Sequence, residues 1–164
     1  MLPAFPTVVE RHGPMVWRVC RSMLTATDAE DAWSETFLAA LQAYPRLDGD
    51  AHLAGWLATI AHHKAVDRLR AGARARPVAD VPDVAVRDTA RDPDPALWAA
   101  VRALPDRQRH ALVLRHVADL PYVDVAAAMG GTPAAARRAA ADALAALRTT
   151  LADHPDAPPP LEAR

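Results

Sequence analysis

The chain has 164 residues, of which 51% are hydrophobic and 24% are charged, and its formal net charge is −1. This balance is typical of a globular protein with one domain or two small ones. No apolar run reaches the roughly 18 residues of a membrane span, and no segment has the order of a signal peptide. The single cysteine, Cys20, excludes an internal disulfide. We therefore expect a cytoplasmic protein in which Cys20 is a buried small side chain.

Apolar residues at helical spacing run through the first 71 residues. The first stripe, from Phe5 to Met23, is interrupted by a Gly-Pro pair at 13–14, which predicts two helical pieces with a kink. Residues 27–30 have the form of a capping box, and they would open a helix that ends before Pro45. A polar loop follows at 46–51, and a further helix is expected to begin near His52, with a buried stripe of Leu53, Trp56, Leu57 and Ile60.

The helix that the capping box opens has an acidic side. Asp31 and Glu35 lie four residues apart and Asp28 lies one turn earlier, an arrangement in which like charges repel by a few tenths of a kcal/mol. The positive N-terminus of the helix accounts for Asp28 and Asp31, but Glu35 lies beyond its reach. A basic partner is one explanation of this face, and a solvated surface is the other.

The second half of the next helix is basic. Within nine residues it gathers hydrogen-bonding or cationic side chains, opposed only by Asp67: His62, His63, Lys64, Arg68 and Arg70. Such a segment, following Trp56, suits contact with phosphates and stacking on unpaired bases. Alternatively, the cations only favour the negative C-terminus of the helix.

The periodic pattern stops over residues 72–95, where five Gly or Pro residues interrupt it, and we predict an irregular interdomain linker. Helices are expected again at 96–104 and 106–117, followed by a helix-turn-helix. Residues 152–164 are rich in proline and are not expected to fold. The prediction is therefore an all-α fold with two small helical domains, at 1–71 and 96–151.

The helix-turn-helix is predicted from residues 120–133. Its first helix would span 122–129, the Gly-Gly pair at 130–131 would allow a turn with positive φ, and Thr132 would cap a second helix that begins with Pro133. In this motif the second helix enters the major groove of DNA. The alternative is an ordinary pair of antiparallel helices that contacts no nucleic acid.

Charge favours DNA. Residues 96–151 contain seven arginines and four aspartates, a net charge of +3 (7 − 4), whereas the whole chain is at −1. The cationic excess is therefore local, as a phosphate backbone requires.

Three stretches carry a family resemblance. They are DAEDA with ETFL at 28–38, RLDGDA with GWLATIA and DRLR at 46–70, and LPDRQR with ALVLR and the helix-turn-helix at 104–133. Together they resemble the small, two-domain bacterial sigma factors of the extracytoplasmic-function group, within the sigma-70 family. The resemblance implies a region 2-like domain at 1–71, a linker at 72–95, a region 4-like domain at 96–151 and a tail at 152–164.

The resemblance also implies a role for each segment. Docking on core RNA polymerase would involve Asp28, Asp31, Glu35, Phe37 and Leu38. Recognition and melting of the promoter −10 element would involve Asp48, Gly49, Asp50, His52, Trp56, His62, His63, Lys64, Asp67, Arg68 and Arg70. The −35 element would be read by Thr132, Arg137 and Arg138. It implies no catalytic residue, metal or cofactor, and it implies an anti-sigma factor as a possible further partner.

The chain also departs from the family pattern. Histidines occupy positions 62 and 63, where asparagine or arginine is common in the family. The recognition helix has alanine at six of the nine positions 134–142, where the family has polar and basic residues. Methyl groups discriminate poorly between bases, so we expect weak reading of the −35 element.

A promoter-specificity subunit of RNA polymerase is the favoured hypothesis. The alternatives are a sigma-like protein whose Ala-rich C-terminal module binds protein, and a helix-turn-helix regulator that acts without docking on polymerase. An enzyme is the weakest option, because the adjacent residues His62 and His63 would point about 100° apart on a helix and no metal-ligand spacing is present.

Overall fold

The computed structural model describes residues 1–49, 52–75 and 94–152. These segments contain seven α-helices, one short 3-10 helix and no strand, so the all-α prediction is confirmed for this part of the chain. None of the helices in it has the length and hydrophobicity needed to cross a membrane. Asp50, most of the predicted linker and nearly all of the predicted tail lie outside the described residues.

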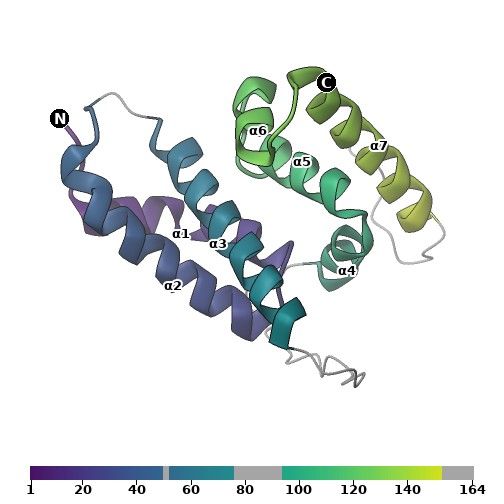
Figure 1. The fold of residues 1–164 in the computed structure, drawn as a ribbon, viewed down its shortest axis with the longest axis horizontal. Coiled ribbons are helices and arrows are strands. Elements are labelled where there is room, and N and C mark those ends of the chain that lie inside the picture. The colour runs from purple at the N-terminus through teal and green to yellow at the C-terminus, as the bar shows by residue number, and fades with distance from the viewer. Residues whose placement is uncertain (50–51, 76–93, 153–164) are drawn as a thin grey trace.

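The N-terminal helices form one packed unit. Helices α1 (Phe5–Arg21), α2 (Ala26–Ala43) and α3 (Leu53–Ala75) each contact the other two, and η1 (Tyr44–Arg46) follows α2 (Figure 1). Their core is built from small and medium side chains, because the chain has only eight aromatic residues; fully buried members include Val16, Ala32, Ala40 and Leu57. Cys20 is also fully buried, as predicted, and burial raises the pKa of its thiol to about 12.

Helix α1 differs from the prediction of two pieces, because a single helix runs through Pro14. Proline lacks an N–H, so it removes one hydrogen bond of the helix. Packing against α2 compensates: Gly13 is buried, and its carbonyl oxygen accepts a hydrogen bond of 3.1 Å from Nε1 of Trp33. The sequence pattern could not anticipate this contact between residues 20 positions apart.

The N-cap of α2 also differs from the prediction. The helix begins at Ala26 and its cap is Thr25, two residues before the predicted cap Thr27; the hydroxyl of Thr25 accepts a hydrogen bond from the backbone N–H of Asp28 at 3.3 Å. Thr27, in contrast, lies within the first turn and is exposed. We expect Thr25→Ala to lower the free energy of unfolding by about 1 kcal/mol. The control Thr27→Ala should change it by less than about 0.5 kcal/mol. Chemical denaturation of the two variants measures both values. A larger effect at Thr27 would mean that Thr27 caps the helix, as the capping box at 27–30 predicts.

The C-terminal helices form a second unit. It consists of α4 (Pro95–Ala103), α5 (Asp106–His116), α6 (Tyr122–Met129) and α7 (Pro133–Ala152), with α7 packed on the other three (Figure 1). Leu114, Val125 and Ala140 are fully buried in its core. The buried Arg109 joins α5 to the end of α4, since it donates to the carbonyl of Arg102 at 2.5 Å and pairs with the Asp106 carboxylate.

Candidate polymerase and DNA interfaces

The helix-turn-helix has the predicted geometry. Helix α6 spans Tyr122–Met129, Gly130 has a φ of 71°, and α7 begins at Pro133. The hydroxyl of Thr132 accepts a hydrogen bond from the N–H of Ala135 at 3.2 Å, as expected of an N-cap. Because only glycine adopts this positive φ without strain, Gly130 sets the angle at which α7 leaves the turn.

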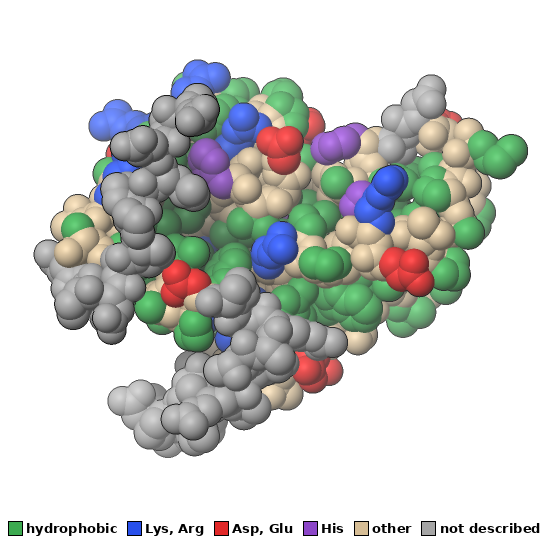
Figure 2. All heavy atoms as spheres, turned by 180° about the vertical axis from the view of Figure 1, so that it is seen from behind, with side chains coloured by type: hydrophobic (Ala, Val, Ile, Leu, Met, Phe, Trp, Pro, Cys, Tyr) green, Lys and Arg blue, Asp and Glu red, His purple; other side chains and the backbone are tan. Residues whose placement is uncertain are grey.

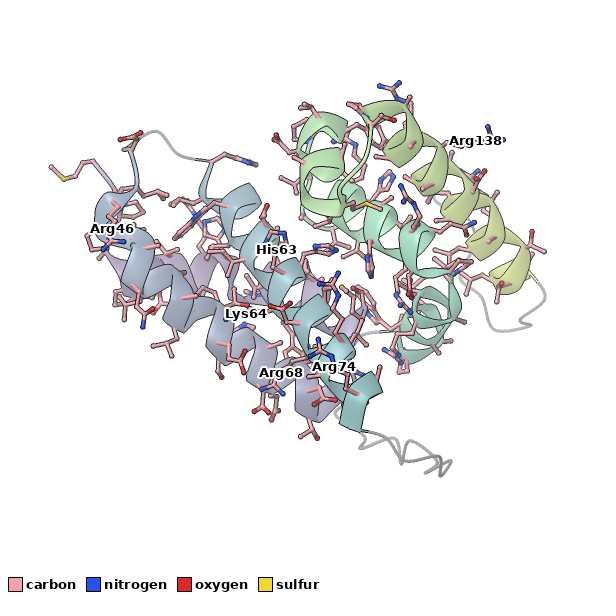
Figure 3. The ribbon with its side chains drawn as sticks, viewed as in Figure 1. Arg46, His63, Lys64, Arg68, Arg74 and Arg138 are labelled. Atoms are coloured by element: carbon pink, nitrogen blue, oxygen red, sulfur yellow. The ribbon has the colours of Figure 1, made fainter. Side chains whose placement is uncertain are left out.

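The outward face of α7 carries the predicted arginines. Ala136, Ala140 and Ala143 face the core, whereas Arg137 and Arg138 are exposed. Arg138 lies on the side of α7 that is turned away from the rest of the chain (Figure 3). Seen from behind, basic side chains project from the outer edge of the C-terminal unit, at the upper left of Figure 2.

Two neighbours of Arg137 were missed by the sequence reasoning. Its guanidinium lies 5.1 Å from the ring centre of Tyr122, and that of Arg115 lies 5.3 Å from the same ring. Arg115 also donates to the carbonyl of Leu120 at 3.0 Å. These cation–π contacts position Arg137 beside the first helix of the motif. The tyrosine at the first position of α6 was the only sign of this contact in the sequence. A spacing of 15 residues between Tyr122 and Arg137 does not by itself predict that the two side chains meet.

The acidic side of α2 has a basic partner within the same chain. Arg68 of α3 lies 2.6 Å from Glu35, 3.1 Å from Asp31 and 3.5 Å from Asp28 (Figure 3). The hydrogen bond to Glu35 raises the pKa of the guanidinium, and Arg68 relieves the repulsion between the three carboxylates. The carboxylate side chains are still 42–58% exposed, so they are accessible to a second cation.

Leu38 extends this acidic face. It lies seven residues after Asp31 and is 58% exposed, and Leu41, one turn further on, is 50% exposed. We name Asp31, Glu35 and Leu38 the acidic-leucine surface. Phe37 differs from its predicted role, because it is only 6% exposed and packs edge-on against the rings of Trp33 and Phe5. Its side chain therefore stabilises the core and offers no surface to a partner.

The residues predicted to contact the −10 element lie along α3 and the loop before it. Asp48, Gly49, His52, His63, Asp67 and Arg70 are exposed, and Trp56, Lys64 and Arg68 are half-buried. Three of them, His52, Trp56 and His63, line a cavity of about 320 Å³ whose other wall comes from Leu120 and from Asp124, Ala127 and Ala128 of α6. The structure therefore brings His52, Trp56 and His63 together under α6, whereas the other predicted residues lie along α3 and in the loop before it.

His62 is placed differently. It is 4% exposed, and its ring meets that of His110 on α5 edge-on, with 4.8 Å between the ring centres. Burial, followed by the charges of His110 and His63, lowers the pKa of His62 to about 3. In this arrangement of the two units His62 is inaccessible to DNA.

The arrangement points to binding chemistry. Among residues 1–49, 52–75 and 94–152, no group of three or more His, Cys, Asp or Glu side chains is placed to hold a metal ion. What this part of the chain presents is an acidic surface with an exposed leucine on α2, a basic and aromatic surface on α3, and arginines on α7. The acidic surface suits contact with a cationic group, and the basic side chains suit contact with phosphate.

Comparison with known families identifies both units. The family described as Sigma-70 region 2 matches residues 8–75, and Sigma-70, region 4 matches residues 95–147. The ECF RNA polymerase sigma factor SigD of Mycobacterium tuberculosis (strain ATCC 25618 / H37Rv) is 32% identical over 160 residues, which cover 88% of this chain and 76% of SigD. The RNA polymerase sigma factor CarQ of Myxococcus xanthus is 31% identical over 141 residues, which cover 82% of this chain and 81% of CarQ.

Solved structures agree with the fold. CnrH, in complex with the cytosolic domain of CnrY, superposes with a TM-score of 0.64 at 27% identity, over 91% of this chain and 88% of CnrH. The sigma factor RpoE from Bartonella quintana, in complex with the anti-sigma factor NepR, superposes with a TM-score of 0.71 over 92% of this chain and 98% of RpoE. Its identity is 18%, so this likeness concerns the fold alone. Taken with the two region matches, these relatives place the chain in the extracytoplasmic-function group of the sigma-70 family, as a promoter-recognising sigma factor of bacterial RNA polymerase.

Proposed function

We propose that this sigma factor docks on core RNA polymerase through α2, captures the −10 element with α3 and places α7 on the −35 element. The observation that carries the proposal is the acidic-leucine surface on α2, which lies beside a helix with exposed His63 and Arg70 and half-buried Trp56 and Lys64. The proposed domains are residues 1–71 and 96–151, with a linker at 72–95 and a tail at 152–164. The family matches at 8–75 and 95–147 support this division, although α3 continues to Ala75.

The polymerase contact is proposed at the acidic-leucine surface, with Asp28 at its edge. Arg68 already pairs with these carboxylates, which indicates that the site accepts a guanidinium. A basic helix of the polymerase would extend this charge pairing, and Leu38 would supply apolar contact at the end of the face.

Capture of the −10 element is proposed for the exposed side of α3. Trp56 offers a ring on which an unpaired base can stack, while Lys64 and Arg70 supply positive charge for the strand backbone. Stacking captures bases only after the duplex has opened, so this surface would favour melted over paired DNA. Asp48, Gly49, His52, His63 and Asp67 belong to the same proposed site, as does Asp50, which lies outside the described residues. Arg68 is held on the other side of α3 by the carboxylates of α2.

For the −35 element we expect an electrostatic contact. The double variant Arg137→Ala/Arg138→Ala should weaken duplex binding about equally for all sequences, because alanines occupy most of the remaining positions at the start of α7. The slope of log K against log salt should fall by roughly 2, about one for each phosphate contact that is lost. Arg148→Ala, near the other end of α7, is the control and should keep the slope. An unchanged slope in the double variant would mean that these arginines do not contact phosphate.

The decisive experiment is transcription with purified core polymerase and this chain, with mapping of the RNA 5′ ends. Start-site-specific products that depend on the chain support the proposal. Binding of core polymerase without such products would favour a sigma-like protein whose C-terminal module binds protein. Failure to retain core polymerase in a pull-down would favour a regulator that acts alone.

Three further features belong to the proposal. The polymerase forms the phosphodiester bond, and the sigma chain supplies no catalytic group. A cytoplasmic location follows from its partners. CnrH was solved with the cytosolic domain of CnrY, and we propose a protein partner of this kind for the present chain, which in this family would be an anti-sigma factor.

A further inference from the structure

The two helical units touch along α3, and the approach is close. Gly55 is buried there, and a Cβ atom at this position would lie 2.6 Å from Cδ2 of Leu120 in the C-terminal unit. A second contact joins the far ends of the units, where Nη1 of Arg102 donates to the carbonyl of Arg21 at 3.3 Å. The cavity lined by His52, Trp56 and His63 lies along this junction, so α6 limits access to the promoter-facing side of α3.

A pair of buried imidazoles lies in the same junction. His62 of α3 and His110 of α5 meet edge-on at 83°, with 4.8 Å between their ring centres. Neither ring nitrogen of His62, and not Nε2 of His110, has a hydrogen-bond partner among the described residues. Neutral rings tolerate such an environment, whereas an imidazolium without an acceptor is strongly disfavoured.

The surrounding charges give little help to a protonated ring. On α3, His63 lies 5.8 Å from His62, and on α5, Arg109 opposes protonation of His110 while Asp106 favours it. On α6, Asp124 lines the cavity with His52 and His63. The carboxylates of α2 that face α3 form ion pairs with Arg68, and Arg11 of α1 acts on His12, on the same helix.

We propose that the contact between His62 and His110 is an acid-sensitive latch, which holds the C-terminal unit over the promoter-facing side of α3 and releases it when the imidazoles are protonated. The consequence for promoter access rests on the proposed function, because the role of α3 in DNA capture belongs to that proposal. The latch itself concerns only the arrangement of the two units. It can therefore be tested without polymerase or DNA.

The direction of the pH effect follows from the two pKa values. Burial lowers the pKa of His62 to about 3 and that of His110 to about 4, against 6.5 for a solvated histidine. The closed arrangement is therefore fully stabilised above pH 6.5 and loses stability as the pH falls toward these lowered values. If the open form has ordinary histidines, the ratio of closed to open chains falls roughly 100-fold by pH 5.5 and several thousand-fold by pH 4.5.

Small-angle X-ray scattering of the full chain at pH 7.5, 5.5 and 4.5 tests the latch, with circular dichroism at each pH to follow helix content. We expect the radius of gyration to rise as the pH falls while the helix signal is kept. A chain that stays compact down to pH 4.5 would overturn the proposal. Expansion accompanied by loss of helix would overturn it too, since that result means unfolding of the units.

Variants assign the effect to the two rings. His110→Leu leaves one buried imidazole and should reduce the change in the closed-to-open ratio to roughly tenfold at pH 5.5. His62→Leu/His110→Leu keeps an apolar contact with no titrating group, and we expect it to stay compact at pH 4.5. His116→Leu, an exposed histidine on the same helix, is the control and should expand like the wild type. Equal expansion of the double variant would assign the switch to other groups.

Discussion

Replacement of both Asp31 and Glu35 by lysine is expected to weaken binding of core RNA polymerase by roughly 100-fold. Both side chains are partly exposed on α2, at 58% and 42%, and they are the charged members of the acidic-leucine surface. Reversing the two charges turns two attractions to a basic partner into two repulsions. The new lysines also repel the guanidinium of Arg68. Affinity is measured by fluorescence anisotropy of the labelled sigma factor titrated with core enzyme.

The matched control changes the same number of charges elsewhere on the N-terminal unit. Glu10 and Glu30 are exposed and line a different pocket, between α1 and α2, so Glu10→Lys/Glu30→Lys should bind nearly as well as the wild type. Thermal unfolding of both double variants separates a binding defect from a folding defect. Equal losses in the two variants would mean that net charge matters and that the acidic-leucine surface has no special role.

The second large effect concerns stability. Leu57 is fully buried where α3 meets the other helices of its unit, and Leu57→Ala should lower the free energy of unfolding by about 2–5 kcal/mol. The loss combines the transfer free energy of the removed methyl groups with the cavity that they leave. A unit of this size has a stability of only a few kcal/mol, so we expect a large share of the N-terminal units to unfold at 37 °C. Urea denaturation followed by circular dichroism measures the change.

Leu41→Ala removes the same atoms from a side chain that is 50% exposed on α2. It should change the free energy of unfolding by less than about 0.5 kcal/mol. Similar losses in the two variants would contradict the position of Leu57 in the core.

Much of the C-terminal unit could be predicted from local rules. A Gly-Gly pair followed by Thr-Pro has few conformational choices, and helix α6, the positive φ of Gly130 and the cap by Thr132 are all found at the predicted residues. Each of these features depends on groups that lie within four positions of one another. The same rules misplaced the cap of α2, because two threonines compete there and the box at 27–30 has the more regular form.

Local rules predicted the polymerase-docking and DNA-binding residues less well, because the exposure of a side chain depends on which helices pack against each other. Helical spacing assigned an acidic side to α2, but it could not supply the cation that neutralises it, since Arg68 lies 33 positions after Glu35. It likewise could not separate the buried Phe37 from its neighbour Leu38, which is exposed.

The amino-acid sequence was sufficient to predict the all-α class and the helix-turn-helix, because apolar period, caps and turns act over a few residues. The family was predicted from the resemblance of three stretches of the sequence, and the two region matches confirm it. Only the folded chain decides which of those helices lie against each other. The contact between His62 and His110, on helices of different units, follows from that packing. The same contact buries His62, which the sequence analysis had assigned to DNA binding. Burial and desolvation are properties of the assembled neighbourhood, and no local pattern of residues contains them.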